Sequence, residues 1–159
     1  MPAHGHDWND TVYEWTDFHT SVTAMHTCRY DATHAETETV NVIAVILPPT
    51  ESAEGSAVYT SEEFTKAGFS IQTKTITIPA LQNMATVRLP EGLRRIEEEA
   101  FSNLTCQAVI IPDGCTCIGE HSFAGCSSLT YIRIPSSVTG WDDNVFEGCS
   151  DNLIIDWTK

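Results

Sequence analysis

The stretch IPDGCTCIGEHSFAGCSSL, Ile111–Leu129, decides the fold because its pattern recurs on both sides of it. Each copy begins with an apolar residue followed by proline, and a phenylalanine follows at a constant offset. The pairs, spaced 22 and then 23 residues apart, are Leu89-Pro90, Ile111-Pro112 and Ile134-Pro135, and the phenylalanines are Phe101, Phe123 and Phe146. A period of this length, with strands that end at a fixed point, is typical of a solenoid.

One copy shows how a coil would form. In Val109-Ile110-Ile111 the first and third residues point inward, and the strand adds one rung to a parallel sheet. Pro112 then ends the rung, because proline has no N–H to donate to a ladder. A single coil cannot bury its own apolar face, so stability has to come from stacked neighbours. We therefore predict a solenoid of about three coils over residues 81–159.

The first half of the chain has a different pattern. It is rich in Thr and Val and alternates between polar and apolar residues, as in Val22–Tyr30 and in TKTITI, Thr73–Ile78. Several short strands separated by turn residues indicate a small β-sandwich-like domain over residues 1–80. The predicted fold class is therefore mainly β, with this module followed by the parallel-sheet solenoid.

Four possible zinc ligands lie close together in the second copy, at Cys115, Cys117, His121 and Cys126. Alignment of the copies places Cys115 and Cys126 at inward apolar positions, whereas Cys117 and His121 fall at variable outer positions. A tetrahedral site cannot be closed from opposite sides of one rung, so buried structural thiols are the preferred interpretation. A disulfide between Cys126 and Cys149 on successive coils stays open as an alternative.

Charge and hydropathy exclude several classes of protein. The 159 residues include 22 acidic side chains against 8 Lys and Arg, for a formal net charge of −14, and such a surface repels nucleic acids. No apolar run reaches the roughly 20 residues that span a bilayer. The N-terminal MPAHGHDWND does not have the pattern of a signal peptide. The segment is therefore expected to be cytosolic or a piece of a longer exported chain, without membrane insertion.

The region from Thr86 to Asp156 resembles the BspA-type leucine-rich repeat, whose pattern is close to I-P-x-x-V-x-x-I-G-x-x-A-F-x-x-C-x-x-L. The second copy matches nearly every position, and the outer copies depart from the pattern at Glu97, Leu104, Trp141 and Asp142. The resemblance implies a secreted or cell-surface protein of a host-associated bacterium, larger than this chain. It also implies adhesion, through binding of host or matrix proteins or glycans.

The first half is similar to a module that accompanies such repeats, on the segments GHDW (Gly5–Trp8), CRYDATHAETETV (Cys28–Val40) and FSIQTKTITIPAL (Phe69–Leu81). If His6, Cys28 and His34 converge, they could hold a metal ion, with Glu51 as a possible fourth ligand. A half-buried Cys28 beside loop histidines is the preferred interpretation. The sequence implies no cofactor.

Three classes of function compete for this chain. As a binding module, the solenoid would present its sheet face through Arg88, Ile110, Tyr131 and Arg133, since Arg and Tyr are favoured interface anchors. As a structural spacer in a surface stalk, it would bind nothing itself. An enzyme is disfavoured, because no nucleophile with a partnered base, no phosphate loop and no distinct carboxylate pair is recognisable.

Overall fold

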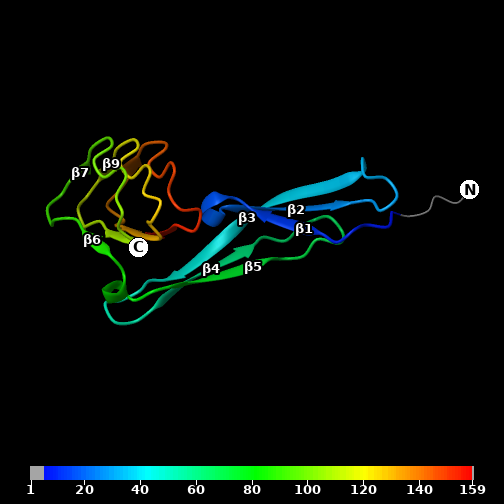
Figure 1. Cartoon of the computed structure of the whole chain (residues 1–159), viewed down its shortest axis with the longest axis horizontal. Helices are drawn as coiled ribbons and strands as arrows, with labels where there is room; N and C mark the ends of the chain where they lie inside the picture. Colours follow the sequence, from blue (N-terminus) through cyan, green and yellow to red (C-terminus); the bar gives the residue numbers. More distant parts are fainter. Residues whose placement is uncertain (1–5, 159) are drawn as a thin grey trace, which may run out of the picture. The chain divides into compact units, whose positions relative to one another are not determined.

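The computed structural model describes residues 6–158, so Gly5 of the GHDW motif lies outside it. The fold is mainly β, as predicted, with a curled antiparallel sheet followed by stacked parallel strands (Figure 1). Where the sequence predicts a sandwich-like module, the structure has a single curled sheet. Its strands, in spatial as in chain order, are β1 (Val12–Trp15), β2 (Ser21–Thr27), β3 (Ala35–Leu47), β4 (Gly55–Ser61) and β5 (Thr73–Ile78).

The alternation in β2 produces one buried and one more exposed face. Val22, Ala24 and His26 are buried, whereas Met25 is exposed. On the latter face Thr23 pairs with Thr39 of β3, and their hydroxyl oxygens lie 2.7 Å apart. Such cross-strand hydroxyl pairs are a common source of sheet stability. A 3-10 turn, η1 (Asp17–His19), connects β1 to β2.

The solenoid contains two parallel sheets, and its coils are visible in Figure 1. The first sheet consists of β6 (Thr86–Arg88), β8 (Ala108–Ile110), β10 (Tyr131–Ile134) and β12 (Ile154–Trp157), and the second of β7 (Arg95–Ile96), β9 (Cys117–Ile118) and β11 (Gly140–Trp141). A second 3-10 turn, η2 (Leu81–Asn83), precedes β6. Strand β12 adds a rung that the repeat marker did not reveal, because Trp157 is followed by Thr158 and not by proline.

The turns that close the coils are hydrogen-bonded to one another along the stack. The Phe101 N–H donates to the Ser122 carbonyl at 2.8 Å, and the Phe123 N–H donates to the Val145 carbonyl at 3.0 Å. The three phenylalanine rings stack nearly parallel, with centroids 5.6 and 5.9 Å apart. The phenylalanine positions predicted from the repeat therefore form a continuous aromatic column.

The structure divides into two compact units, and the boundary between them divides the long strands. One unit contains Met1–Val45 and Val58–Thr75, and the other contains Ile46–Ala57 and Ile76–Lys159. The tip of the β3–β4 hairpin, residues 46–57, therefore belongs to the same unit as the repeats, although the sequence assigned it to the first domain. This assignment matters for the predicted binding face.

A glycine between two coils provides a test of the stacking. A Cβ atom at Gly119 would lie 2.7 Å from the Glu98 nitrogen and 2.9 Å from the Glu97 carbonyl carbon, which are backbone atoms of the preceding coil. We expect Gly119→Ala to lower the free energy of unfolding by about 1–3 kcal/mol, as overpacking does. Urea denaturation measures the change. Gly140→Ala is the matched control, because its Cβ would meet nothing within 4 Å; equal losses for the two variants would contradict this packing.

Candidate functional site

The four residues of the predicted sheet face lie on adjacent strands but differ greatly in accessibility. Arg88 is exposed, and Ile110 and Arg133 are half-buried. Tyr131 is fully buried, with 0% of its surface exposed, so it cannot serve as an anchor for a partner. The face is therefore not the open, solvated surface that the strand pattern indicated.

Tyr131 and Arg133 belong to a hydrogen-bonded network with Asp156 of β12. The Tyr131 hydroxyl donates to Asp156 Oδ2 at 2.5 Å, and Arg133 Nε lies 3.5 Å from the same oxygen. Arg133 Nη2 donates to the Tyr131 hydroxyl at 3.1 Å. Burial, aided by the bond to Asp156, raises the pKa of Tyr131 well above its ordinary value. The network links β10 to β12. The Tyr131 hydroxyl stays protonated throughout the physiological pH range.

The hairpin tip contacts the same sheet face. Arg133 Nη2 donates to the Pro49 carbonyl at 3.3 Å, and Arg88 forms an ion pair with Glu51. Backbone bonds join the tip to η2, since the Leu81 N–H donates to the Thr50 carbonyl at 2.9 Å. The predicted binding face is thus largely an internal interface of the chain. Glu51, considered as a fourth metal ligand, is a partner of Arg88 instead.

The metal candidates of the first half form an aromatic cluster. The rings of His6 and His34 meet edge to face with centroids 4.1 Å apart, and Trp8 stacks on His26 at 4.1 Å. Cys28 is buried and bridges to Trp8 through the backbone. Within residues 6–158, no group of three or more His, Cys, Asp or Glu side chains is arranged to hold a metal ion. The geometry therefore places these histidines against aromatic rings and not around a common centre.

The cysteines of the repeats lie as the alignment predicted. Cys115 and Cys126 are fully buried, whereas Cys117 and His121 are partly exposed. Cys126 and Cys149 are free thiols, and each donates to a backbone carbonyl of the preceding coil. Burial raises the pKa of the Cys115 and Cys126 thiols, and it raises that of Cys149 to about 11.

These environments predict the order of thiol labelling. At about pH 8 we expect iodoacetamide to modify Cys117 first, because only a thiolate with solvent access reacts readily. Cys115 and Cys126 should be modified only after unfolding in urea, and peptide mass mapping distinguishes the sites. Modification of Cys126 at the rate of Cys117 in the folded chain would contradict the burial of the Cys126 thiol inside the coil.

The turns of the solenoid carry a second group of side chains on its outside. At three equivalent positions, 22 and 23 residues apart, they place an acidic residue that is exposed in every coil, and we name this set the acidic ladder: Glu98, Glu120 and Asp143. The Glu99 N–H donates to the Glu120 carbonyl at 3.1 Å, which brings the first two coils into register at this level. The three carboxylates carry the same charge, and like charges repel one another.

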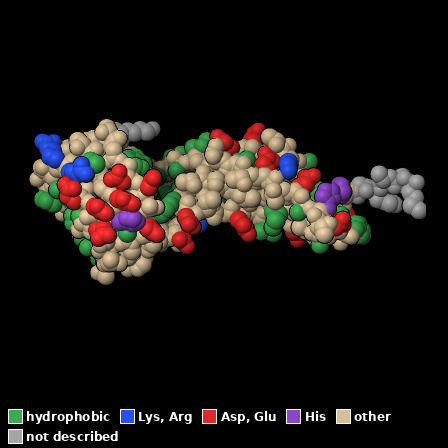
Figure 2. All heavy atoms as spheres, turned by 90° about the horizontal axis from the view of Figure 1, so that it is seen from above, with side chains coloured by type: hydrophobic (Ala, Val, Ile, Leu, Met, Phe, Trp, Pro, Cys, Tyr) green, Lys and Arg blue, Asp and Glu red, His purple; other side chains and the backbone are tan. Residues whose placement is uncertain are grey.

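Further carboxylates flank the ladder. Exposed acidic residues on the same turns are Glu97, Glu99, Asp142 and Glu147. Arg95 pairs with Glu97 at 3.1 Å, and His121 Nε2 lies 2.8 Å from Glu147. Figure 2 shows acidic side chains gathered over the repeat part of the molecule. The turn surface is therefore strongly negative, with few cations to balance it.

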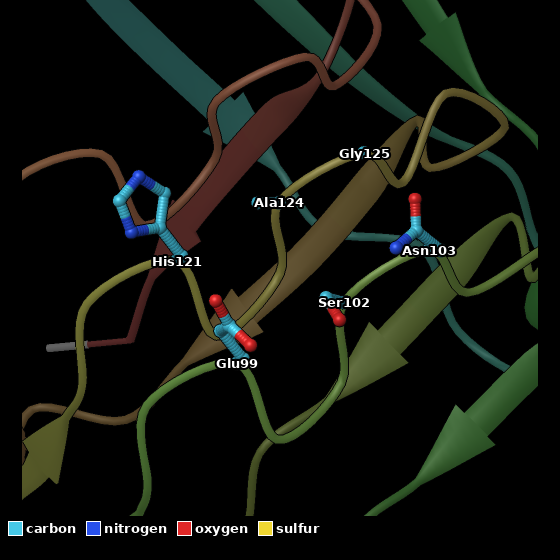
Figure 3. Close-up of a pocket in the computed structure, with 6 residues that line it drawn as sticks. All are labelled: Glu99, Ser102, Asn103, His121, Ala124 and Gly125. Atoms are coloured by element: carbon cyan, nitrogen blue, oxygen red, sulfur yellow. The ribbon is translucent and has the colours of Figure 1, made fainter.

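A hollow of about 280 Å³ lies on the same turn surface, between the first two coils. It is lined by Glu99, Ser102 and Asn103 from one turn and by His121, Ala124 and Gly125 from the next (Figure 3). Gly125 adopts a left-handed φ of 69°, and a Cβ there would lie 2.4 Å from Asn103 Oδ1. Glycine is therefore needed both for the turn and for the approach of Asn103.

Comparison with known families agrees with this architecture. The BspA type leucine rich repeat region matches residues 53–156 with six copies. The chain belongs to this family. The match confirms the resemblance of the repeats and extends it toward the N-terminus, over β4 and β5. No curated protein matches the chain. None of the helices in the described part of the chain is long and apolar enough to cross a membrane.

The BspA-type repeat explains which surface features the sequence revealed. Its period predicts which positions are buried in each coil and which face of each strand points outward. It does not predict the contact of the hairpin tip with the sheet, because residues 46–57 lie far away in the chain. The charge run Glu97–Glu99 is visible in the sequence, but a run of charges alone indicates no more than a solvated face. Alignment of residues 98, 120 and 143 could have identified the acidic ladder, because the same offsets apply to them.

Proposed function

We propose that this chain is a non-enzymatic protein-binding module of a bacterial cell-surface protein, acting in adhesion through the turn surface of its solenoid. Membership of the BspA-type family supports a binding role, since such repeats often serve as binding modules of surface proteins. The observation that carries the proposal is the acidic ladder, in which Glu98, Glu120 and Asp143 occupy equivalent exposed positions in the turns of successive coils.

Like charges at equivalent turn positions give the coils no stabilising contact with one another, which is why the ladder supports a functional role. Repulsion between exposed like charges is modest, on the order of the 0.2–1 kcal/mol that an exposed ion pair gains. A partner with clustered Lys and Arg would relieve this repulsion and would be drawn to the surface by its field. The partner class is therefore a basic segment of a host or matrix protein.

Removing charge from the ladder tests the proposal. The triple variant Glu98→Gln, Glu120→Gln, Asp143→Asn keeps the shape of the side chains and removes three negative charges. We expect its binding to an immobilised mammalian extracellular-matrix extract, measured by biolayer interferometry, to fall about tenfold or more. The reason is that neutralising close charge pairs at an interface costs roughly 1.4 kcal/mol or more of binding free energy.

A matched control separates the ladder from net charge. Glu14→Gln, Glu62→Gln, Glu63→Gln removes the same charge from exposed positions outside the two parallel sheets of the solenoid and the turns that join them. Binding of this control should stay close to that of the unmodified chain. If both variants lost binding equally, only the total charge would matter and the ladder would not be the site.

One observation favours the second candidate function, a spacer in a surface stalk. The sheet face, where a partner was expected, is contacted by Pro49 and Glu51 of the chain itself. A spacer needs such internal contacts and no ligand. Absence of measurable binding by the unmodified chain, beside binding by a longer chain that contains it, would favour the spacer.

A further inference from the structure

Two thiols occupy equivalent positions in consecutive coils of the solenoid. Cys126 and Cys149 are 23 residues apart, which is also the offset between register partners of β10 and β12. The residue before each cysteine is a glycine, and the two glycines lie side by side, since a Cβ atom on Gly148 would lie 3.6 Å from the Gly125 Cα. The two cysteines are therefore neighbours along the stack.

Both sulfur atoms point along the stack in the same direction. Cys149 Sγ donates to the Phe123 carbonyl at 3.1 Å, and this carbonyl belongs to the coil that carries Cys126. Cys126 Sγ donates in the same way to the Phe101 carbonyl, one coil earlier, at 3.3 Å. The two thiols also share a side-chain hydrogen bond. The sulfur of Cys149 therefore lies against that of Cys126, with no other side chain between them.

The spacing and the accessibility of this pair suit a disulfide. Adjacent strands of a parallel stack lie about 4.8 Å apart, and a disulfide joins Cα atoms that are roughly 4.4–6.8 Å apart. Cys126 is fully buried, whereas Cys149 is partly exposed. A small reagent can therefore reach the sulfur of Cys149 first, while the sulfur of Cys126 lies behind it inside the coil.

A third thiol, Cys106, is the competing partner for Cys126. It is buried, and its pKa is raised by burial and by the neighbouring Cys126. Cys106 does not occupy the equivalent position, however. It lies two residues before Ala108, which is in register with Tyr131, so its equivalent in the next coil is Leu129. Register therefore favours a bond between Cys126 and Cys149 over a bond between Cys126 and Cys106.

We propose that Cys126 and Cys149 form a site of oxidative modification, at which a small-molecule disulfide is exchanged for a disulfide between the two coils. The Cys149 thiolate attacks one sulfur of the small disulfide, breaks its S–S bond and releases one thiolate. The Cys126 thiolate then attacks the Cys149 sulfur of this mixed disulfide and releases the second thiolate. The released thiolates take up the two protons that the cysteines lose. The two cysteines are thus oxidised by two electrons, and the small disulfide is reduced to two thiols.

The new bond would fasten two coils that are otherwise held by packing and by backbone hydrogen bonds. It closes a loop from residue 126 to residue 149, which restricts the unfolded chain and so stabilises the folded one. Burial raises the pKa of both thiols, so few thiolates form at neutral pH and exchange in the folded chain is slow there. The chemistry needs an oxidising environment. It does not involve the acidic ladder, so bridging and adhesion can be tested separately.

Refolding of the whole chain in a buffer of oxidised and reduced glutathione, at about pH 8.5 where an ordinary thiol is half ionised, tests the proposal. After alkylation, digestion without reductant after Glu120 and Arg133 places Cys106, Cys126 and Cys149 on separate peptides. We expect the Cys126–Cys149 bond to be at least about tenfold more abundant than the Cys106–Cys126 bond. The bridged chain should have a urea midpoint about 1 M or more above that of the reduced chain.

Cys149→Ser should abolish both the bond between the coils and the gain in urea midpoint. Cys117→Ser is the matched control, because it removes a partly exposed thiol from the coil that carries Cys126. This control should form the bond like the unmodified chain, and circular dichroism checks that each variant is folded. A bond from Cys126 to Cys106 as the main product, glutathione adducts without a bond between the coils, or a bridged chain no more stable than the reduced chain would each overturn the proposal.

Discussion

Replacing Phe123 by alanine is expected to lower the free energy of unfolding by about 3–5 kcal/mol, the cost of truncating a fully buried aromatic residue. Phe123 is 0% exposed and lies between two parallel rings, those of Phe101 and Phe146. Its loss would open a cavity in the middle of the column, where the neighbouring coils cannot collapse without breaking the backbone bonds between turns. Urea denaturation followed by far-UV circular dichroism measures the change.

Phe101→Ala is the control for this variant. Phe101 occupies the same position one coil earlier, but it stacks on one ring and is partly exposed. Its truncation should therefore cost clearly less than that of Phe123. Equal losses for the two substitutions, or a loss below about 1 kcal/mol for Phe123, would be inconsistent with a continuous aromatic column.

The second large effect is expected for Asp156→Ala, at about 3–5 kcal/mol, because removal of one partner from a buried charged network leaves the others unpaired. The substitution removes the acceptor of the Tyr131 hydroxyl and the carboxylate beside Arg133. Chemical denaturation again provides the measurement. It also tests how the hairpin tip is held, since Arg133 donates to the Pro49 carbonyl.

A double-mutant cycle separates the network from simple loss of packing. Tyr131→Phe alone should cost about 1–2 kcal/mol, and the double variant should lose less than the sum of the two single losses. Glu97→Ala, which breaks the exposed pair with Arg95, should cost at most about 1 kcal/mol. Strict additivity of Asp156→Ala and Tyr131→Phe would show that the two side chains do not interact.

The sequence was sufficient for the repeats because each inward position is repeated at a fixed offset. Cys115, Ile118, Phe123 and Cys126 are all buried as predicted, and the apparent zinc cluster resolved into inward and outward positions. Local periodicity in the sequence indicates which face of a strand packs against the core of its own coil. It therefore predicts burial well inside a solenoid.

The sequence was insufficient for the outer sheet face because that face is covered from a distance. The outward position of Tyr131 follows from alternation, but the residue is buried, its hydroxyl bonds to Asp156, and the hairpin tip contacts Arg133 on the same strand. Neither contact has a period, and the tip precedes Tyr131 by about 80 residues. In the first half, the strands were predictable by alternation, whereas curling of a single sheet is a tertiary feature.

These observations move the proposed binding surface from the sheet to the turns. The sheet face holds the chain together through Tyr131, Arg133 and Asp156, and its remaining exposed cation, Arg88, already pairs with Glu51. The turns carry the acidic ladder, whose charges oppose stacking and have no role in the core. A stabilising function and a binding function would thus occupy different sides of the same coils.

The most direct test of this account measures stability and adhesion together in the ladder variant, Glu98→Gln, Glu120→Gln, Asp143→Asn. If the ladder is retained for binding at the expense of folding, the free energy of unfolding should rise by up to about 1 kcal/mol while binding to the matrix extract falls about tenfold. Unchanged binding, with or without a gain in stability, would contradict the account.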